Sequence, residues 1–359
     1  MARLFSPVHF RSVTARNRIV MPPMCQYSAN EGLGTDWHVQ HLGARAAGGV
    51  GIVITEAIAV EPRARISANC LGLWNDAQQQ FAARLASVIA LGGAVPGMQL
   101  NHAGRKASGR RPWEGATALP PAEGGWVPLG ASPISYGETF LAPEELDAAG
   151  IQAAIGQFAS AAARARAAGF RLIQLHGAHG YLLHSFLSPI SNRRADAYGG
   201  DLAGRSRLLF EVVEAVRGVW PEELPLFVRL SAVDWMAGGV TLEDTVAVAK
   251  RLKATGKVDL IDCSSGGIAL KGPEIPSLHP GYQVPFAEAV RHQAGIATGA
   301  VGLITAPEHA EEILANRRAD VVSVGRGLLA DPAWPLRAAR RLGAEPPLPT
   351  QYLRAAPVA

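Results

Sequence analysis

The feature that most constrains the fold of this chain is a regular alternation of short apolar runs with longer amphipathic segments. Each run holds about four to six residues, rich in β-branched side chains and continuous rather than alternating, as in parallel strands covered on both faces. We predict eight such strands, at residues 18–21, 51–55, 95–100, 172–176, 226–230, 260–264, 296–301 and 321–324.

Helical patterns fill the gaps between these runs. The clearest segments span residues 76–91, 144–168, 205–219, 242–255 and 307–316. Thr241 and Pro307 are helix-start residues, and Gly92, Gly169 and Gly256 stand where helices end. Eight βα units predict a closed (β/α)8 barrel that forms a single domain over residues 1–359. A doubly wound open sheet is the structural alternative.

Composition supports a globular enzyme and narrows its partners. Hydrophobic residues make up 48% of the chain and charged residues 18%, which indicates a large core. The net charge is only +4, and the basic residues are scattered without interleaved aromatics, so we expect no nucleic-acid partner. Cys25, Cys70 and Cys263 are too few for a disulfide framework and favour a reducing cytosol. Without a signal-like or membrane-spanning run, we expect a cytoplasmic protein with no membrane partner.

Two segments depart from the regular alternation. Residues 104–143, between the third and fourth strands, are rich in glycine and proline, and we interpret them as a lid or excursion over the barrel mouth. An uninvolved surface loop is the alternative. Residues 343–359 form a proline-rich tail that can extend beyond its own barrel, with an ordinary frayed terminus as the alternative.

The residues after each predicted strand are the candidate site, because barrel enzymes place their chemistry at the carboxyl ends of the strands. Two prolines end the first strand and bring Cys25 and Tyr27 to the mouth, although a lone cysteine can also be a small core residue. Gln99 and Lys106 close the third strand, where their desolvation favours a bound polar ligand. A loop salt bridge is the alternative for Lys106.

Two histidines three residues apart follow the fourth strand. His176 and His179 can point the same way on a glycine-loosened turn, with Tyr181 two residues further on. A metal pair is one interpretation, but no third ligand is obvious nearby, and we predict no metal site. We interpret the imidazoles as two N–H donors aimed at one oxygen, with a purely structural pair as the alternative.

Cationic and glycine-rich strand ends complete the candidate site. Arg229, at the end of the buried fifth strand, needs an anionic or electron-rich partner. Gly302 follows the seventh strand, and Gly325 and Arg326 follow the eighth, a pattern typical of a phosphate cradle in barrels. The glycines at 48–51 precede their strand, so they are no dinucleotide fingerprint.

These stretches resemble the old yellow enzyme family of FMN-dependent ene reductases, and within it the bacterial, thermophilic-like subgroup with a cysteine near the flavin. The likeness runs from Leu4 to Arg354 and is most specific at residues 17–27, 99–106, 176–181, 186–200 and 324–326. Departures from the family pattern lie at residues 201–205 and at Ala356, where an aromatic residue often stands.

The resemblance implies FMN as cofactor, NADPH or NADH as reductant, and enones or enals as small-molecule substrates. Hydride from flavin N5 would reduce the C=C bond, with His176 and His179 binding the carbonyl oxygen and Tyr181 donating the proton. Tyr27 would line the substrate pocket, and Arg354 would enter the site of a neighbouring subunit in a homodimer or homotetramer. The implied isoalloxazine contacts are Pro23, Met24, Cys25, Ala57, Gln99 and Arg229, and the implied phosphate ligands are Gly302, Gly325 and Arg326.

Two other functions stay open at this point. One is another flavin-barrel oxidoreductase, of the dienoyl thioester reductase or amine dehydrogenase type, which the absence of spare cysteines and of a C-terminal Rossmann half disfavours. The other is a non-catalytic flavin-binding barrel, which the intact His176, His179 and Tyr181 disfavour.

Overall fold

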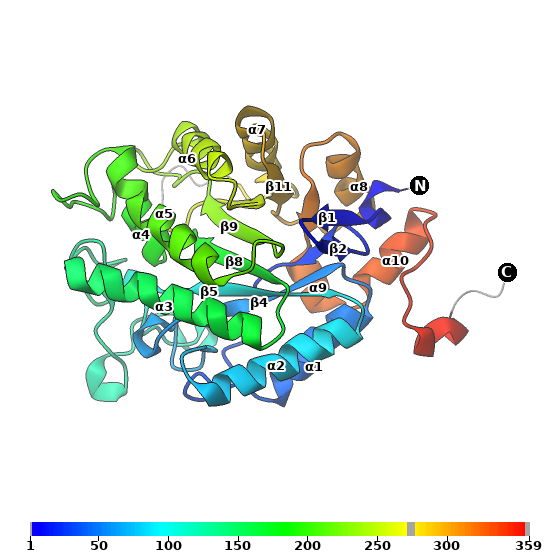
Figure 1. Ribbon diagram of the computed structural model, residues 1–359, viewed down its shortest axis with the longest axis horizontal. Coiled ribbons are helices and arrows are strands. Elements are labelled where there is room, and N and C mark those ends of the chain that lie inside the picture. The colour runs from blue at the N-terminus through cyan, green and yellow to red at the C-terminus, as the bar shows by residue number, and fades with distance from the viewer. Residues whose placement is uncertain (1, 271–276, 356–359) are drawn as a thin grey trace.

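The eight predicted strands form one closed parallel barrel in the computed structural model, which describes residues 2–270 and 277–355 (Figure 1). Closure is made by strand pairing of Val322 with Ile19 and of Ser323 with Val20, which excludes the open sheet. The strands are β3 (Ile19–Met21), β4 (Ile52–Ala59), β5 (Val95–Asn101), β8 (Leu172–Gly177), β9 (Leu226–Ser231), β10 (Leu260–Ser264), β11 (Ala297–Ala300) and β12 (Val321–Ser323).

Helices surround the barrel, and their caps explain where several begin (Figure 1). The side chain of Asn75 accepts the Gln78 N–H at 2.9 Å at the start of α2, and Thr241 caps α6 in the same way. The outer helices are α1 (Asp36–Ala47), α2 (Asp76–Leu91), α3 (Ala148–Ala167), α5 (Leu202–Val219), α6 (Leu242–Ala254), α7 (Val284–Ala294), α8 (Pro307–Ala315) and α10 (Trp334–Arg341). Two short helices, α4 (Leu182–Leu187) and α9 (Arg326–Ala330), follow β8 and β12.

Two predicted boundaries, the start of one helix and the end of one strand, are wrong because strand pairing decides where these elements begin and end. The helix expected at 144–168 begins only at Ala148, because β7 (Glu144–Glu145) pairs with β6 (Leu129–Gly130) before Asp147 caps α3. The second strand, expected to end at 55, continues through a register shift between Ile54 and Ala57. Glu56 and Ala57 therefore lie inside β4, where such an irregularity re-aims side chains.

A hairpin that the sequence pattern did not predict covers the amino-terminal end of the barrel. It consists of β1 (Val8–Phe10) and β2 (Val13–Ala15). The Phe10 ring packs edge-on against Phe227 of β9, with 4.9 Å between the ring centroids. Because this end is closed by apolar packing, the opposite end is the one left for a ligand.

The excursion at residues 104–143 contacts the mouth. The Trp113 ring lies edge-on to Tyr27 at 5.7 Å between centroids. Trp126 donates its indole N–H to the Arg63 carbonyl at 2.9 Å, and Arg105 donates to the Ile134 carbonyl at 3.3 Å. These contacts place the segment beside the carboxyl ends of β3, β4 and β5; whether it acts as a lid stays a prediction.

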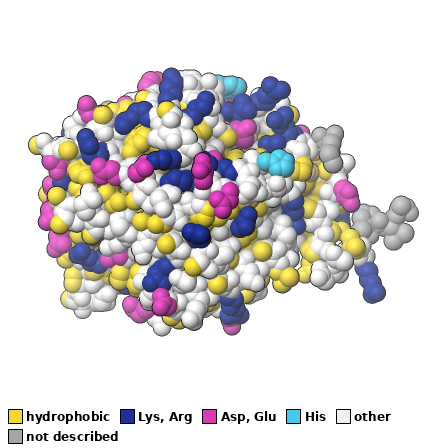
Figure 2. Space-filling view, in the orientation of Figure 1, with side chains coloured by type: hydrophobic (Ala, Val, Ile, Leu, Met, Phe, Trp, Pro, Cys, Tyr) yellow, Lys and Arg dark blue, Asp and Glu magenta, His cyan; other side chains and the backbone are white. Residues whose placement is uncertain are grey.

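The C-terminal tail leaves the barrel after α10 and ends in the 3-10 turn η6 (Thr350–Ala355), at the periphery of Figure 1. Pro349, Gln351 and Tyr352 lie against residues of α1 and α2. Ala356, one of the departures from the family pattern, lies outside the described residues. Basic and acidic side chains are interspersed over the face in Figure 2. No helix in the described part of the chain is both long enough and apolar enough to span a membrane.

Candidate active site

The end of β8 brings three of the predicted residues together. The His176 ring centroid lies 5.1 Å from that of His179 and 4.8 Å from that of Tyr181. His179 has φ +59° and Gly180 has φ +75°, so two successive residues in the left-handed region turn the chain sharply. This turn folds His179 and Tyr181 back over His176, which explains why the glycine is needed there.

Both imidazoles are neutral at ordinary pH. Burial lowers the pKa of His176 and of His179 well below its usual value, and the positive charge of Arg229 lowers both further. The Nδ1 of His176 accepts the Ala178 N–H at 3.3 Å, so the ring proton resides on Nε2. The Nε2 of His179 lies 2.6 Å from the hydroxyl oxygen of Ser264, a partner that the sequence did not reveal.

Tyr181 and Lys106 form the opposite wall of this cluster. Burial raises the pKa of Tyr181 well above its usual value, so the phenol keeps its proton. Lys106 Nζ lies 5.0 Å from the Tyr181 ring centroid and 4.3 Å from that of Tyr136. It donates to the carbonyls of His179 and Gly267 at 2.8 and 3.2 Å, and burial lowers the pKa of Lys106 to about 7. Among the described residues, the partners of Lys106 are these carbonyls and rings, and not the carboxylate of the loop salt bridge considered for it.

Beneath the mouth, a series of buried polar side chains links the neighbouring strands β5, β8, β9 and β10. Gln99 Nε2 donates to Gln174 Oε1 at 2.7 Å, and Gln174 Nε2 donates to Asp262 at 3.1 Å. The same Asp262 oxygen lies 3.1 Å from Arg229 Nε. The expected anionic partner of Arg229 is therefore Asp262 of the neighbouring strand. Gln174 and Asp262 were missed, although polar side chains within continuous apolar runs were a usable signal.

A hollow of about 200 Å³ beyond β11 and β12 gathers Arg229, Gly302, Gly325 and Arg326. Gly302 has φ +132°, and a Cβ there would lie 3.2 Å from the Gln283 nitrogen, so the backbone must stay bare. Arg326 has no acidic partner among the described residues. The remaining lining residues, which the sequence did not single out, are Ser264, Tyr282, Gln283, Val301, Leu303, Ile304, Thr305 and Ser323.

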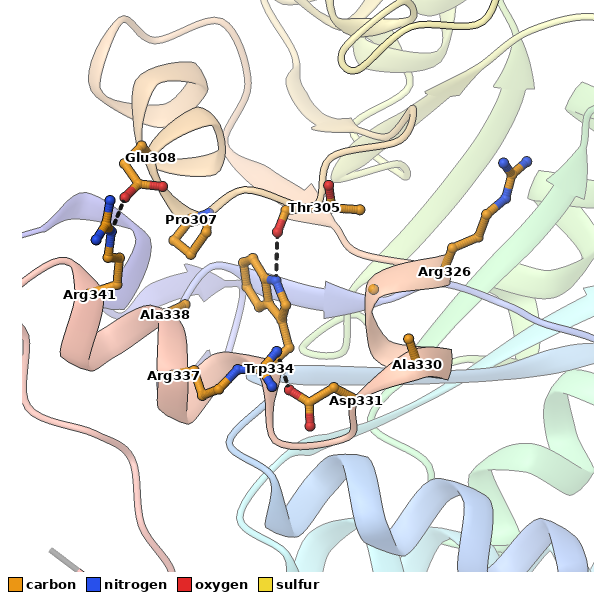
Figure 3. Close-up of a pocket in the computed structure, with 11 residues that line it drawn as sticks. Thr305, Pro307, Glu308, Arg326, Ala330, Asp331, Trp334, Arg337, Ala338 and Arg341 are labelled. Carbon is orange, nitrogen blue, oxygen red and sulfur yellow. Dashed lines mark hydrogen bonds and ion pairs between the residues drawn. The ribbon is translucent and has the colours of Figure 1, made fainter.

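This hollow fits the phosphate of FMN, because an unpaired guanidinium and a bare glycine turn favour an anion. A larger hollow of about 550 Å³ lies between α8 and α10 (Figure 3). Four of the charged side chains that line it form ion pairs with each other: Glu308 pairs with Arg341, and Asp331 pairs with Arg337 at 2.6 Å. In Figure 3 the Arg326 side chain extends away from Trp334, so its charge is directed away from the larger hollow.

The turn after β3 contributes the other predicted cofactor contacts. Cys25 is partly exposed in this turn, and the next residue, Gln26, donates its N–H to Glu56 of β4 at 3.0 Å, which joins the turn to β4 at the mouth. Met24 lies near Gly325, because a Cβ on that glycine would be 3.8 Å from the Met24 sulfur. Pro23 and Tyr27 are both partly buried in the same turn, and burial raises the pKa of Tyr27 far above its usual value.

Arg354 is the one predicted site residue that the structure does not bring to the mouth of its own barrel. Its side chain is exposed on η6, in the tail that lies against α1 and α2. The remaining predicted residues converge on the carboxyl ends of the strands.

A closed parallel barrel with polar and cationic side chains at these ends belongs to the class of (β/α)8-barrel enzymes. Residues 3–345 match the NADH:flavin oxidoreductase / NADH oxidase family, and the chain belongs to that family. It is therefore a flavin oxidoreductase with FMN as cofactor and a nicotinamide dinucleotide as reductant.

Relatives and solved structures cover nearly the whole chain. It is 47% identical over 357 residues to a protein named NADPH dehydrogenase from Listeria innocua serovar 6a, with 99% of both chains covered. Among solved structures it is similar to morphinone reductase, with a TM-score of 0.78, 26% identity, and coverage of 95% of this chain and 90% of that one. It also matches histamine dehydrogenase from Rhizobium sp. 4-9, with a TM-score of 0.78, 25% identity, and coverage of 95% of this chain but 48% of that one.

Proposed function

We propose that the protein is an ene reductase that uses NADPH to reduce the C=C bond of α,β-unsaturated carbonyl compounds. The observation that carries this proposal is the cluster of two neutral imidazoles and a protonated phenol at the carboxyl end of β8. The name NADPH dehydrogenase of the Listeria relative supports NADPH as reductant. The name morphinone reductase supports a reducing direction.

The three side chains match what reduction of an enone requires. FMN, when bound, supplies the hydride for Cβ. His176 donates an N–H hydrogen bond to the carbonyl oxygen, where enolate charge develops, and His179 donates a second one by exchanging its contact with Ser264 for the substrate. One such donor stabilises that charge by about 3 kcal/mol. Tyr181 donates its phenolic proton to Cα. The negative charge of the phenolate favours the protonated form of Lys106, whose pKa is otherwise lowered to about 7, and the resulting ammonium stabilises the phenolate by Coulomb attraction in a site of low dielectric.

Residues of β3, β4, β5 and β9 would hold the isoalloxazine. Gln99 and Arg229 would face its polar edge, and the Gln174–Asp262 chain fixes the orientation of both side chains. Pro23, Met24, Cys25 and Ala57 would complete the contacts. The phosphate would lie against Gly302, Gly325 and Arg326, in the hollow that those residues line.

The catalytic assembly is proposed to be at least a dimer, in which Arg354 enters the partner's substrate pocket. What supports this is that Arg354 is exposed on a tail directed away from its own mouth. A guanidinium there would add a positive charge and close the pocket to water. The three free cysteines agree with a reducing cytosol as the site of action.

The alternative of an amine dehydrogenase is less well supported. The similarity to histamine dehydrogenase covers 48% of that chain, so it extends over the barrel alone. No observation at the mouth favours an amine, since the described cluster beside Tyr181 is cationic or neutral rather than acidic.

The deciding experiment is an anaerobic assay of the purified holoenzyme with NADPH and cyclohexenone. We expect a yellow protein that releases FMN on boiling and forms cyclohexanone at a rate that matches NADPH oxidation. Histamine serves as the substrate that tests the alternative. NADPH oxidation by the FMN-loaded protein without any reduced alkene would contradict the proposed function.

A further inference from the structure

The turn that carries His179 and Tyr181 is bound by a buried histidine that the mechanism does not use. The Nδ1 atom of His184, on α4, accepts the N–H of Gly180 at 2.8 Å. Gly180 stands between His179 and Tyr181, so the position of its peptide group affects where both side chains point. The His184 side chain is 1% exposed, and the contact is therefore formed in the interior of the protein.

A buried carboxylate contacts the other side of the same ring. Asp234, in the loop after β9, has its Oδ1 atom 3.0 Å from His184 Nε2, and its side chain is fully buried. Its Oδ2 atom accepts the Ser188 hydroxyl at 2.6 Å and the Val240 N–H at 2.8 Å. Because Ser188 directly follows α4, these contacts fix the carboxylate both to the helix that carries His184 and to its own loop.

The two neighbours of the ring select one tautomer of His184. A ring nitrogen that accepts a backbone N–H carries no proton, so the proton of the ring resides on Nε2, the atom nearest to Asp234. An imidazolium would have a proton on both nitrogens, and the one on Nδ1 would repel the Gly180 N–H. The contact with Gly180 therefore requires the neutral ring, protonated on Nε2.

Side chains from three parts of the barrel bind the peptide groups of this turn. The N–H of His179 donates to the Ser231 hydroxyl at 2.9 Å, and the His179 carbonyl accepts from Lys106 at 2.8 Å. His184 is the third side chain, and it binds the next N–H along the chain. His179 has φ +59°, a conformation that costs free energy in a residue other than glycine, so the turn depends on these contacts.

We propose that His184 is a positioning residue that holds His179 and Tyr181 in the orientation that the reaction requires. It does so by accepting the Gly180 N–H through Nδ1, and Asp234 fixes the tautomer that permits this contact. His184 acts through the turn and not through contact with the reacting atoms. The catalytic consequence rests on the proposed function, in which His179 and Tyr181 serve the substrate; the hydrogen bond and the tautomer do not.

Two substitutions separate the roles of the two ring nitrogens. In His184→Asn the amide oxygen takes the position of Nδ1 and can accept the Gly180 N–H, but the contact with Asp234 is lost. In His184→Gln the amide nitrogen reaches the position of Nε2 and can donate to Asp234, but the acceptor for Gly180 is lost. If the buried pair only stabilised the fold, His184→Gln would be the milder change, because it keeps a partner for the buried carboxylate. A positioning role predicts the reverse order.

Cyclohexenone reduction and phenol binding, both measured on the FMN-loaded enzyme, report the positioning. We expect His184→Gln to lower kcat by about 10²-fold, because a displacement of about 1 Å at the reacting groups has this effect, and His184→Asn to keep most of the wild-type kcat. The oxygen of phenol accepts the same imidazole donors as the substrate. Phenol should bind about 10-fold more weakly to His184→Gln than to His184→Asn in a titration of the flavin absorbance, since one hydrogen bond to a charged oxygen contributes about this factor.

His38 provides a matched control. It is also buried, its Nδ1 accepts the Thr35 N–H at 3.0 Å, and its Nε2 lies 3.6 Å from Glu56 Oε2. The turn that it binds begins α1 and carries none of the predicted site residues. His38→Gln should lose stability in urea unfolding and leave kcat and phenol binding unchanged.

The tautomer is tested in the wild type, so this test does not depend on the folding of His184→Gln. A long-range proton–nitrogen correlation spectrum of the holoenzyme labelled with nitrogen-15 histidine should show His184 with a bare Nδ1 and a protonated Nε2; its signals are those missing from His184→Asn. A proton on Nδ1, or a kcat of His184→Gln at or above that of His184→Asn, would overturn the proposal. A holoenzyme with the expected tautomer and the expected difference in phenol binding that reduces no alkene would leave the positioning role standing and refute the proposed function instead.

Discussion

Replacing Gly180 by alanine is expected to separate the effect of backbone strain from that of crowding at the active site. Gly180 has φ +75°, and a Cβ there would lie 2.3 Å from the Gly267 carbonyl oxygen. That oxygen accepts a hydrogen bond from Lys106 at 3.2 Å, and Gly180 itself links His179 to Tyr181. The substitution therefore disturbs all three groups at once.

The expected cost has two parts. An alanine in the left-handed region costs about 1–2 kcal/mol. The Cβ must in addition move about 0.7 Å to reach the 3.0 Å below which such contacts essentially never occur, and overpacking of this kind costs about 1–3 kcal/mol. We expect Gly180→Ala to lose about 2–5 kcal/mol of unfolding free energy and, because a displacement of about 1 Å costs about 10²-fold in rate, to lower kcat by one to two orders of magnitude.

Gly256 provides the matched control. It has φ +68°, with nothing within 4 Å of an added Cβ, and it follows α6 away from the mouth. Gly256→Ala should lose only the strain of about 1–2 kcal/mol and keep its kcat. Urea unfolding at saturating FMN and cyclohexenone turnover measure both effects. Equal stability losses in the two variants, with kcat unchanged in Gly180→Ala, would refute the reasoning.

Three further expectations address the site and its surroundings. His176→Ala or His179→Ala should each slow alkene reduction by about 10²-fold with FMN still bound, and full activity on cyclohexenone would exclude the donor role. Burial raises the pKa of Glu56 from 4.5 to about 8. Between these two pH values the carboxyl group therefore keeps its proton in the folded protein but loses it in the unfolded chain. Wild-type stability should therefore fall relative to Glu56→Gln as pH rises from 4.5 to 8, by up to about 1.4 kcal/mol per pH unit in urea unfolding; a constant difference would contradict the shift. Arg354→Ala and His176→Ala, each impaired alone, should regain activity in mixed dimers after subunit exchange, and no recovery despite confirmed exchange would disprove a site shared between subunits.

Local sequence patterns were sufficient to predict the barrel. Each strand is a continuous apolar run because both of its faces are covered, and α2 and β10 occur at the predicted residues. The sequence also predicted the turn around Gly180, because a glycine between His179 and Tyr181 can adopt the left-handed conformation that other residues resist. These features depend on neighbours within a few residues, so the sequence alone determines them.

Tertiary structure decided which distant residues meet. The extension of β4 past residue 55 depends on its register with β5, and the strand at Glu144–Glu145 depends on pairing with Leu129–Gly130. Gln99 is linked to Arg229 only because the pairing of β5, β8, β9 and β10 brings Gln174 and Asp262 between them. Such contacts join residues far apart in the chain, and no pattern of spacing along the sequence encodes them, because the geometry that selects them exists only once the strands concerned have paired.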